Sequence, residues 1–199
     1  SNYAYGEAGD PTKNIPPNSE ILVKMTLLSW ESEKPSWEMS VEEKLEASNK
    51  RKLEGNECFK KAKYARAIKK YQKALGYINS EYDFKEDEEK EKATAQKIPI
   101  FLNMAQCNIK QKNYGDAASN CGKVIDLDDK NVKAHFRRGQ AHLNLAEFDQ
   151  ANKDFTKAKE LDPENKEVLQ HLALLKKKVK EQEEKDKKLY SSMFNGISY

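Results

Sequence analysis

Five polar residues in the middle of the chain have types and spacings suited to holding a doubly charged anion. Lys52 and Asn56 lie four residues apart, as do Lys133 and Arg137, so each pair shares one face of a helix. Asn103 stands alone within an apolar run. Arginine grips a carboxylate with two hydrogen bonds, and lysine and asparagine each donate single bonds. The set predicts a site for a ligand with two neighbouring carboxylates, such as a peptide that ends in Asp.

The surrounding charge favours the same ligand. Residues 50–73 contain ten Lys or Arg and two Glu. A lysine on such a helix is commonly just a solvated side chain, and a single Asn in an apolar run can simply bond a backbone carbonyl. The anion site is favoured over this simpler interpretation because the five residues fall at matching positions of an internal repeat.

That repeat is visible in four sets of positions, each of which holds one class of residue. The last two members of every set are 34 residues apart, and the first two are 50 apart, which is one repeat plus a 16-residue insertion near residues 79–92. The sets are Gly55, Ala105 and Gly139; Tyr64, Tyr114 and Phe148; Ala67, Ala117 and Ala151; and Ala74, Val124 and Ala158.

The repeat predicts pairs of antiparallel helices. Small residues let the two helices of a pair approach closely, and the aromatic residue fills the turn between them. Stacked pairs form a curved array whose first helices line a groove, and the five polar residues fall on those first helices. The predicted fold is mainly α: a right-handed array of three repeats within residues 40–163 (about 48–81, 98–131 and 132–165), followed by a C-terminal extension helix over 164–199. An apolar stripe of Val168, Leu172, Leu175 and Val179 should cover the last repeat.

The first 38 residues have a different character. They contain four of the six prolines and several turn signals, and residues 21–28 alternate apolar and polar side chains as a strand does. One strand cannot bury a core by itself. Since the chain also begins without Met, this segment is predicted to be the end of a β domain followed by a linker.

The composition argues against several other functions. A net charge of +3 in 199 residues is small for a nucleic-acid-binding protein, and the apolar runs are too short to span a bilayer. Cys58, Cys107 and Cys121 lack metal-ligand spacing, and they indicate reduced thiols in a cytoplasmic protein. His135 and His142 could suggest a metal pair, but the cysteines sit at packing positions of the repeat and no metal or other cofactor is expected.

The 34-residue unit resembles the tetratricopeptide repeat, and the five polar residues resemble the dicarboxylate clamp of tetratricopeptide co-chaperones. Lys52, Asn56, Asn103, Lys133 and Arg137 each match that motif in residue type. The resemblance implies binding of the C-terminal Met-Glu-Glu-Val-Asp tail of the Hsp90 chaperone. It also implies a cytoplasmic location, with a nuclear pool as an open addition.

The two ends of the chain extend the resemblance to the large FKBP-type immunophilins. The segments that carry it are residues 3–6, 15–18, 21–28, 36–45 and 188–194. Only Tyr5 and Ile15 match positions of the isomerase pocket, and Val23 replaces a frequent aromatic. The resemblance therefore implies a parent peptidyl-prolyl cis-trans isomerase but no activity in these residues alone.

Three alternatives stay open at this point. The parent could be an isomerase whose helical repeats serve only as a scaffold or dimer contact. The chain could be a helical nucleic-acid-binding protein, although no basic surface with interleaved aromatic residues is evident. Residues 180–194 are basic and amphipathic enough to suggest a calmodulin-type partner, with a solvated helix end as the simpler interpretation.

Overall fold

The computed structural model describes residues 8–20, 22–29 and 34–195. The chain divides into two compact units, residues 1–34 and residues 35–199, and each is considered by itself. The second unit contains all of the α-helices that the structure describes.

The N-terminal unit does not form the expected strand. Its described part contains a short 3-10 helix, Pro11–Lys13, and an isolated β-bridge between Asp10 and Ile15. Residues 22–29 are irregular, and the apolar side chains of Leu22, Met25 and Leu27 are exposed. The strand predicted over residues 21–28 is wrong for residues 22–28, and residue 21 lies outside the described residues. A strand is stable only when its backbone groups pair with a neighbouring strand, and the described residues contain no such strand.

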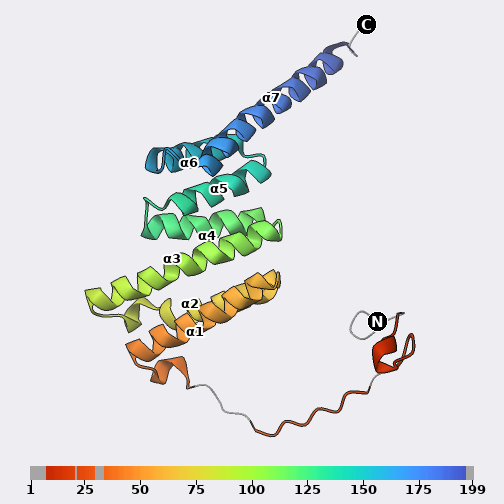
Figure 1. Ribbon diagram of the computed structural model, residues 1–199. Coiled ribbons are helices and arrows are strands. Elements are labelled where there is room, and N and C mark those ends of the chain that lie inside the picture. The colour runs from red at the N-terminus through yellow and green to blue at the C-terminus, as the bar shows by residue number, and fades with distance from the viewer. Residues whose placement is uncertain (1–7, 21, 30–33, 196–199) are drawn as a thin grey trace. The chain divides into compact units, whose positions relative to one another are not determined.

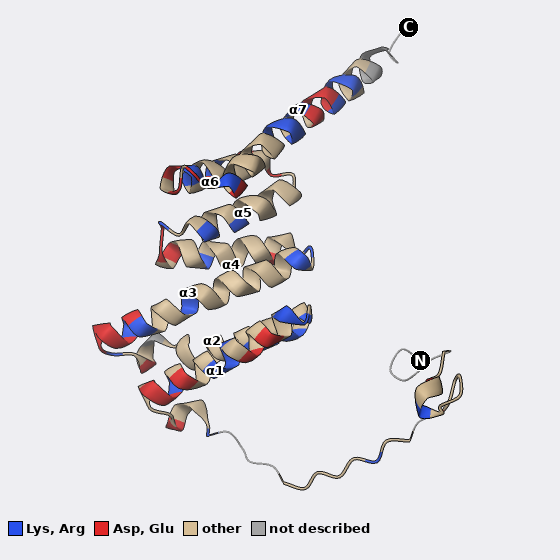
Figure 2. Cartoon of the chain, in the orientation of Figure 1, with Lys and Arg blue, Asp and Glu red and all other residues tan. Residues whose placement is uncertain are grey.

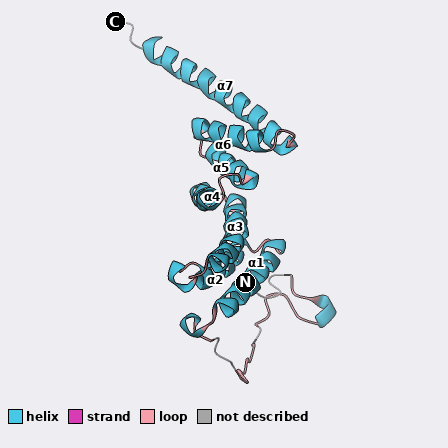
Figure 3. Ribbon diagram, turned by 90° about the vertical axis from the view of Figure 1, so that its left-hand side faces the viewer, coloured by secondary structure: helices cyan, strands magenta, loops and turns pink. Residues whose placement is uncertain are grey.

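The second unit is a stack of antiparallel helix pairs, as Figures 1 and 3 show. The first helices of the pairs contact one another in series, α1 with α3 and α3 with α5, so they line one side of the stack. The fold class predicted from the repeat is confirmed. The helices are α1 (Val41–Lys60), α2 (Tyr64–Ile78), α3 (Asp87–Lys110), α4 (Tyr114–Leu127), α5 (Val132–Asn144), α6 (Phe148–Leu161) and α7 (Lys166–Asn195).

Close helix packing within a pair depends on the small residues of the repeat. A Cβ added to Gly55 would lie 2.5 Å from the Tyr71 ring, and one added to Gly139 would lie 2.7 Å from the Phe155 ring. In both pairs, an aromatic ring of the second helix therefore occupies the space that a side chain on the first helix would need. The glycines at these positions are required by that contact.

Two helix starts are set by reciprocal capping. The Ser40 hydroxyl accepts a hydrogen bond from the Glu43 amide at 3.2 Å, and the Glu43 carboxylate accepts one from the Ser40 amide at 2.7 Å. Glu86 and Glu89 form the equivalent arrangement before α3. Helix α3 thus starts eleven residues before the predicted repeat start at residue 98, and Pro99 lies inside it. Three acidic residues in its first turn, Asp87, Glu88 and Glu89, stabilise this early start through the helix dipole.

Helix α7 closes the array and then extends beyond it. Val168 and Leu175 are buried, and Leu172 and Val179 pack beside Leu175, as the predicted stripe requires. Past Val179 the side chains are mostly exposed, and Figure 2 shows basic and acidic segments alternating along this part of the helix. None of the helices in the described residues is long and apolar enough to cross a membrane.

Candidate functional site

Three of the five predicted site residues meet in one cavity. Asn56 from α1, Asn103 from α3 and Arg137 from α5 line a space of about 340 Å³ on the side of the stack formed by the first helices. Each comes from a different repeat. The stacking of the pairs therefore brings together side chains that lie as far as 81 residues apart in the sequence.

Asn56 is the centre of a hydrogen-bond network in this cavity. Its side-chain oxygen accepts a hydrogen bond from the Asn103 amide at 3.0 Å and a second from the Tyr71 hydroxyl at 2.8 Å. An amide oxygen has two lone pairs, so both are used. The Asn56 amide nitrogen is then the group that remains to donate to a ligand.

Arg137 is partly buried and is anchored to the second repeat. Its Nη1 donates a hydrogen bond of 2.6 Å to the backbone carbonyl of Leu102 on α3. Burial lowers the pKa of Arg137, although a guanidinium stays charged at neutral pH. In the part of the chain that the structure describes, no carboxylate accepts a hydrogen bond from Arg137, Asn56 or Asn103. The cavity therefore presents donors and a positive charge without a protein anion to match them.

The two predicted lysines lie outside this cavity. Lys52 is partly buried one turn before Asn56, and Lys133 is exposed one turn before Arg137. Neither forms an ion pair with a carboxylate of the described residues. Their ammonium groups are on long, rotatable side chains, so they can reach a ligand that extends past the cavity.

Four further residues, which the sequence motifs did not predict, line the cavity. Lys60 follows Asn56 by four positions and Gln106 follows Asn103 by three, so helical spacing from the chosen asparagines could have identified both. Phe59 and Tyr71 also contribute. Tyr71 comes from α2, the second helix of its pair, where the repeat pattern indicates only a packing role.

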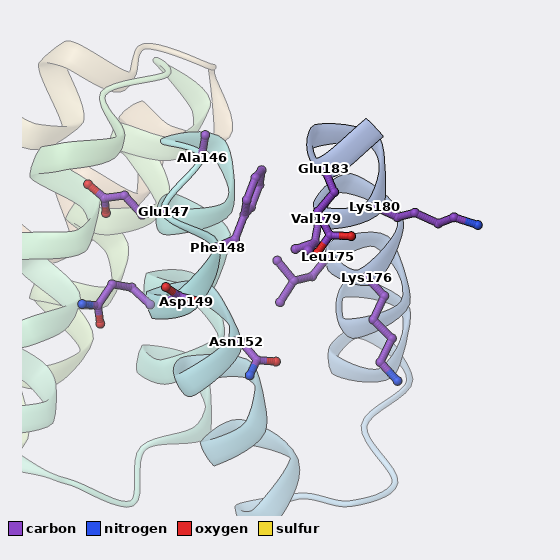
Figure 4. Close-up of a pocket in the computed structure, with 11 residues that line it drawn as sticks. Ala146, Glu147, Phe148, Asp149, Asn152, Leu175, Lys176, Val179, Lys180 and Glu183 are labelled. Carbon is purple, nitrogen blue, oxygen red and sulfur yellow. The ribbon is translucent and has the colours of Figure 1, made fainter. Parts of the chain in front are cut away.

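A larger cavity, of about 940 Å³, lies between the start of α6 and the middle of α7. Figure 4 shows Phe148 and Leu175 directed toward the space between the two helices. Around this apolar floor are basic side chains, Lys176 and Lys180, and acidic ones that include Glu183. Its mixed charge and its lining, which comes from α6, the turn before it and α7, distinguish it from the cavity that α1, α2, α3 and α5 line.

The histidines that could have formed a metal pair contact protein groups. The His135 Nε2 lies 2.9 Å from the Asp129 carbonyl oxygen, and the His142 Nδ1 bonds the Glu147 carboxylate. No group of three potential metal ligands occurs in the described ranges.

Burial raises the pKa of the Cys107 thiol to about 11, which keeps this thiol protonated.

Comparison with known proteins supports the same family as the sequence motifs. The tetratricopeptide repeat pattern matches residues 132–165. The bovine (Bos taurus) peptidyl-prolyl cis-trans isomerase FKBP4 is 42% identical over 98% of this chain, and the chain spans 42% of that relative's length.

Two solved structures share the fold. The C-terminal tetratricopeptide-repeat domain of a Plasmodium falciparum FK506-binding protein superposes with a TM-score of 0.70 at 31% identity, over 75% of this chain and 99% of that one. The first repeat domain of Spaghetti (RPAP3), bound to the HSP90 peptide SRMEEVD, superposes with a TM-score of 0.56 at 26% identity, over 67% of this chain and 94% of that one. Together with the stacked helix pairs, these similarities show that the chain belongs to the FKBP-type immunophilins that carry a tetratricopeptide-repeat domain.

Proposed function

We propose that this domain binds the C-terminal Met-Glu-Glu-Val-Asp tail of an Hsp90 chaperone. The observation that carries the proposal is the cavity in which Asn56, Asn103 and Arg137 present donors from three repeats. A peptide ending in Asp brings two carboxylates close together, one from the side chain and one from the chain end. The terminal carboxylate would accept hydrogen bonds from the two asparagines.

Charge supports binding along the rest of the peptide. Lys52 and Lys133 flank the cavity, one turn before Asn56 and Arg137, and would pair with the aspartate side chain and the preceding glutamates. The basic segment 50–73 would favour the approach of an acidic tail. The Spaghetti repeat domain, whose fold is similar, is bound to a peptide that ends in the same five residues.

The decisive test is calorimetric titration with two versions of the Met-Glu-Glu-Val-Asp peptide, one with a free C-terminal carboxylate and one with a C-terminal amide. Charged hydrogen bonds contribute about 1.5–3 kcal/mol each, and ordering the peptide offsets part of this, so affinity near the micromolar range is expected. The amide should bind at least about tenfold more weakly, since one charged contact is lost. Equal affinity of the two peptides would overturn the proposal and favour a scaffold role.

The longer protein's activity is a separate proposal. Relatives such as FKBP4 are named as peptidyl-prolyl isomerases, and the chain spans less than half of that relative. We infer isomerase activity for the parent and none for these residues, because only two of them, Tyr5 and Ile15, match positions of the isomerase pocket. Ile15 lies in an isolated β-bridge, and Tyr5 falls outside the described residues. A protease-coupled peptide assay on this chain should show only the uncatalysed rate.

Two further expectations remain proposals. Residues 180–194 are the candidate site for a calmodulin-type partner, since most of the described side chains of this stretch are exposed along the extended part of α7. A cytoplasmic location, with a possible nuclear pool, would suit a partner of Hsp90.

A further inference from the structure

Tyr71 lines the cavity from the second helix of the first pair. Its ring fills the space opposite Gly55, and the residue is only 1% exposed. The repeat pattern accounts for the ring, because an aromatic at this position lets α1 and α2 pack closely. It does not account for the hydroxyl.

The third repeat offers an internal comparison. The residue that occupies the same repeat position there is Phe155. Its ring would lie 2.7 Å from a Cβ added to Gly139, close to the 2.5 Å between the Tyr71 ring and a Cβ added to Gly55. In the second repeat the position is Cys121, which is fully buried. Helix packing in this chain is therefore achieved without a hydroxyl at two of three equivalent positions.

The hydroxyl of Tyr71 instead acts on a residue of the proposed site. It donates a hydrogen bond of 2.8 Å to the Asn56 side-chain oxygen. Burial raises the pKa of Tyr71 to about 12, so the hydroxyl keeps its proton at neutral pH. Asn103 donates to the same oxygen at 3.0 Å.

This arrangement determines which end of the Asn56 amide meets a ligand. With the oxygen held by two donors, the amide nitrogen is the group left to donate. A rotated amide would place an oxygen toward the ligand carboxylate, and two acceptors facing each other repel. We propose that Tyr71 is a positioning residue for the peptide site: its hydroxyl orients the Asn56 amide so that it donates to the terminal carboxylate of the ligand. The inference rests on the proposed function.

The test compares Tyr71→Phe with the matched control Tyr77→Phe. Tyr77 is also a buried tyrosine of α2, but it does not line the cavity, and its side chain forms a hydrogen bond with Arg51. Tyr71→Phe should weaken binding of the free-acid peptide about threefold to tenfold, the range of one hydrogen bond, and Tyr77→Phe should not change it. Thermal melts of both variants report any loss of stability.

A double-mutant cycle separates positioning from a structural effect. If Tyr71 acts through Asn56, the Tyr71→Phe substitution should cause no further loss of affinity in an Asn56→Ala background. An equal loss in both backgrounds would refute the positioning role. The side-chain amide signal of Asn56 in a nitrogen-15 spectrum should also shift in Tyr71→Phe, and an unchanged signal would refute the proposal independently of the titrations.

The outcomes also separate this inference from the proposed function. If the wild-type chain binds the free acid and the amide equally, the peptide proposal itself fails. If the wild type prefers the free acid and Tyr71→Phe binds it with unchanged affinity, the peptide proposal stands and the positioning role is wrong.

Discussion

Replacing Arg137 with Ala should affect binding and stability together, whereas replacing Lys133 should affect binding alone. On sequence grounds, both residues face a groove, and an exposed side chain is worth no more than about 0.5 kcal/mol of stability. The structure separates them, because Lys133 is exposed while Arg137 is partly buried and donates to the Leu102 carbonyl at 2.6 Å.

The magnitude follows from that hydrogen bond. A hydrogen bond to a charged group contributes about 1.5–3 kcal/mol. The Leu102 carbonyl lies within α3 and keeps a helical partner when Arg137 is removed. We therefore expect the lower end of the range, about 1.5 kcal/mol, for Arg137→Ala. Its binding loss should be about tenfold or more, since the ligand carboxylates lose a charged partner.

Urea unfolding followed by circular dichroism measures the free energy of unfolding, and titration of the free-acid peptide measures affinity. Lys133→Ala is the matched control: it should bind more weakly and unfold like the wild type. If Arg137→Ala binds the peptide with wild-type affinity, Arg137 does not take part in the binding site. Wild-type stability in the same variant would show that the bond to Leu102 contributes nothing measurable to folding.

Three further predictions concern the packing, the thiols and the charges. Gly139→Ala should destabilise the fold by about 1–3 kcal/mol, because its Cβ would meet the Phe155 ring. Gly122→Ala has open space around it and should stabilise the fold by up to about 1 kcal/mol. Denaturant unfolding measures both changes in the free energy of unfolding, and changes of the same sign would contradict the packing argument. Cys58 is partly buried and should react with a thiol reagent well before the buried Cys107, as peptide mapping can show; equal rates would contradict the burial of Cys107. Hydrogen bonds from Lys70 and then Arg51 lower the pKa of Glu54 in the folded chain below its ordinary value of 4.5. The ionised Glu54 therefore contributes fully to the free energy of unfolding above about pH 4.5, and this contribution is lost as the pH falls through the lower pKa of the folded chain. Glu54→Gln should therefore cost up to about 1 kcal/mol at pH 7 and progressively less in acid, and a pH-independent difference in unfolding would refute this.

The helical array could be predicted because its determinants are periodic and local. Small residues at positions such as Gly55 and Gly139 recur at the repeat spacing, and each meets a ring of its own helix pair. The stripe that begins at Val168 follows one face of one helix. Patterns of this kind show in the sequence because helix geometry relates each residue to its third and fourth neighbours.

Two local predictions, the strand near the N-terminus and the start of the second repeat, differ from the structure for separate reasons. Residues 22–29 alternate as a strand does, yet a strand depends on hydrogen bonds to another strand. Helix α3 runs through Pro99 from a start at Asp87, because capping by Glu86 and Glu89 extends the helix into the charged insertion. Phe84 of that insertion is buried against the array, which helps to hold it in place.

The sequence by itself determined the residue types of the candidate site, and the tertiary structure decided how those residues act. Asn56, Asn103 and Arg137 could be chosen by repeat position, since equivalent positions of stacked repeats face the same side. Sequence spacing does not show that Arg137 bonds the backbone of another repeat or that the Tyr71 hydroxyl reaches Asn56. Those contacts join different helices, and they depend on how closely the helices pack and on which groups are left to pair once the stack has formed.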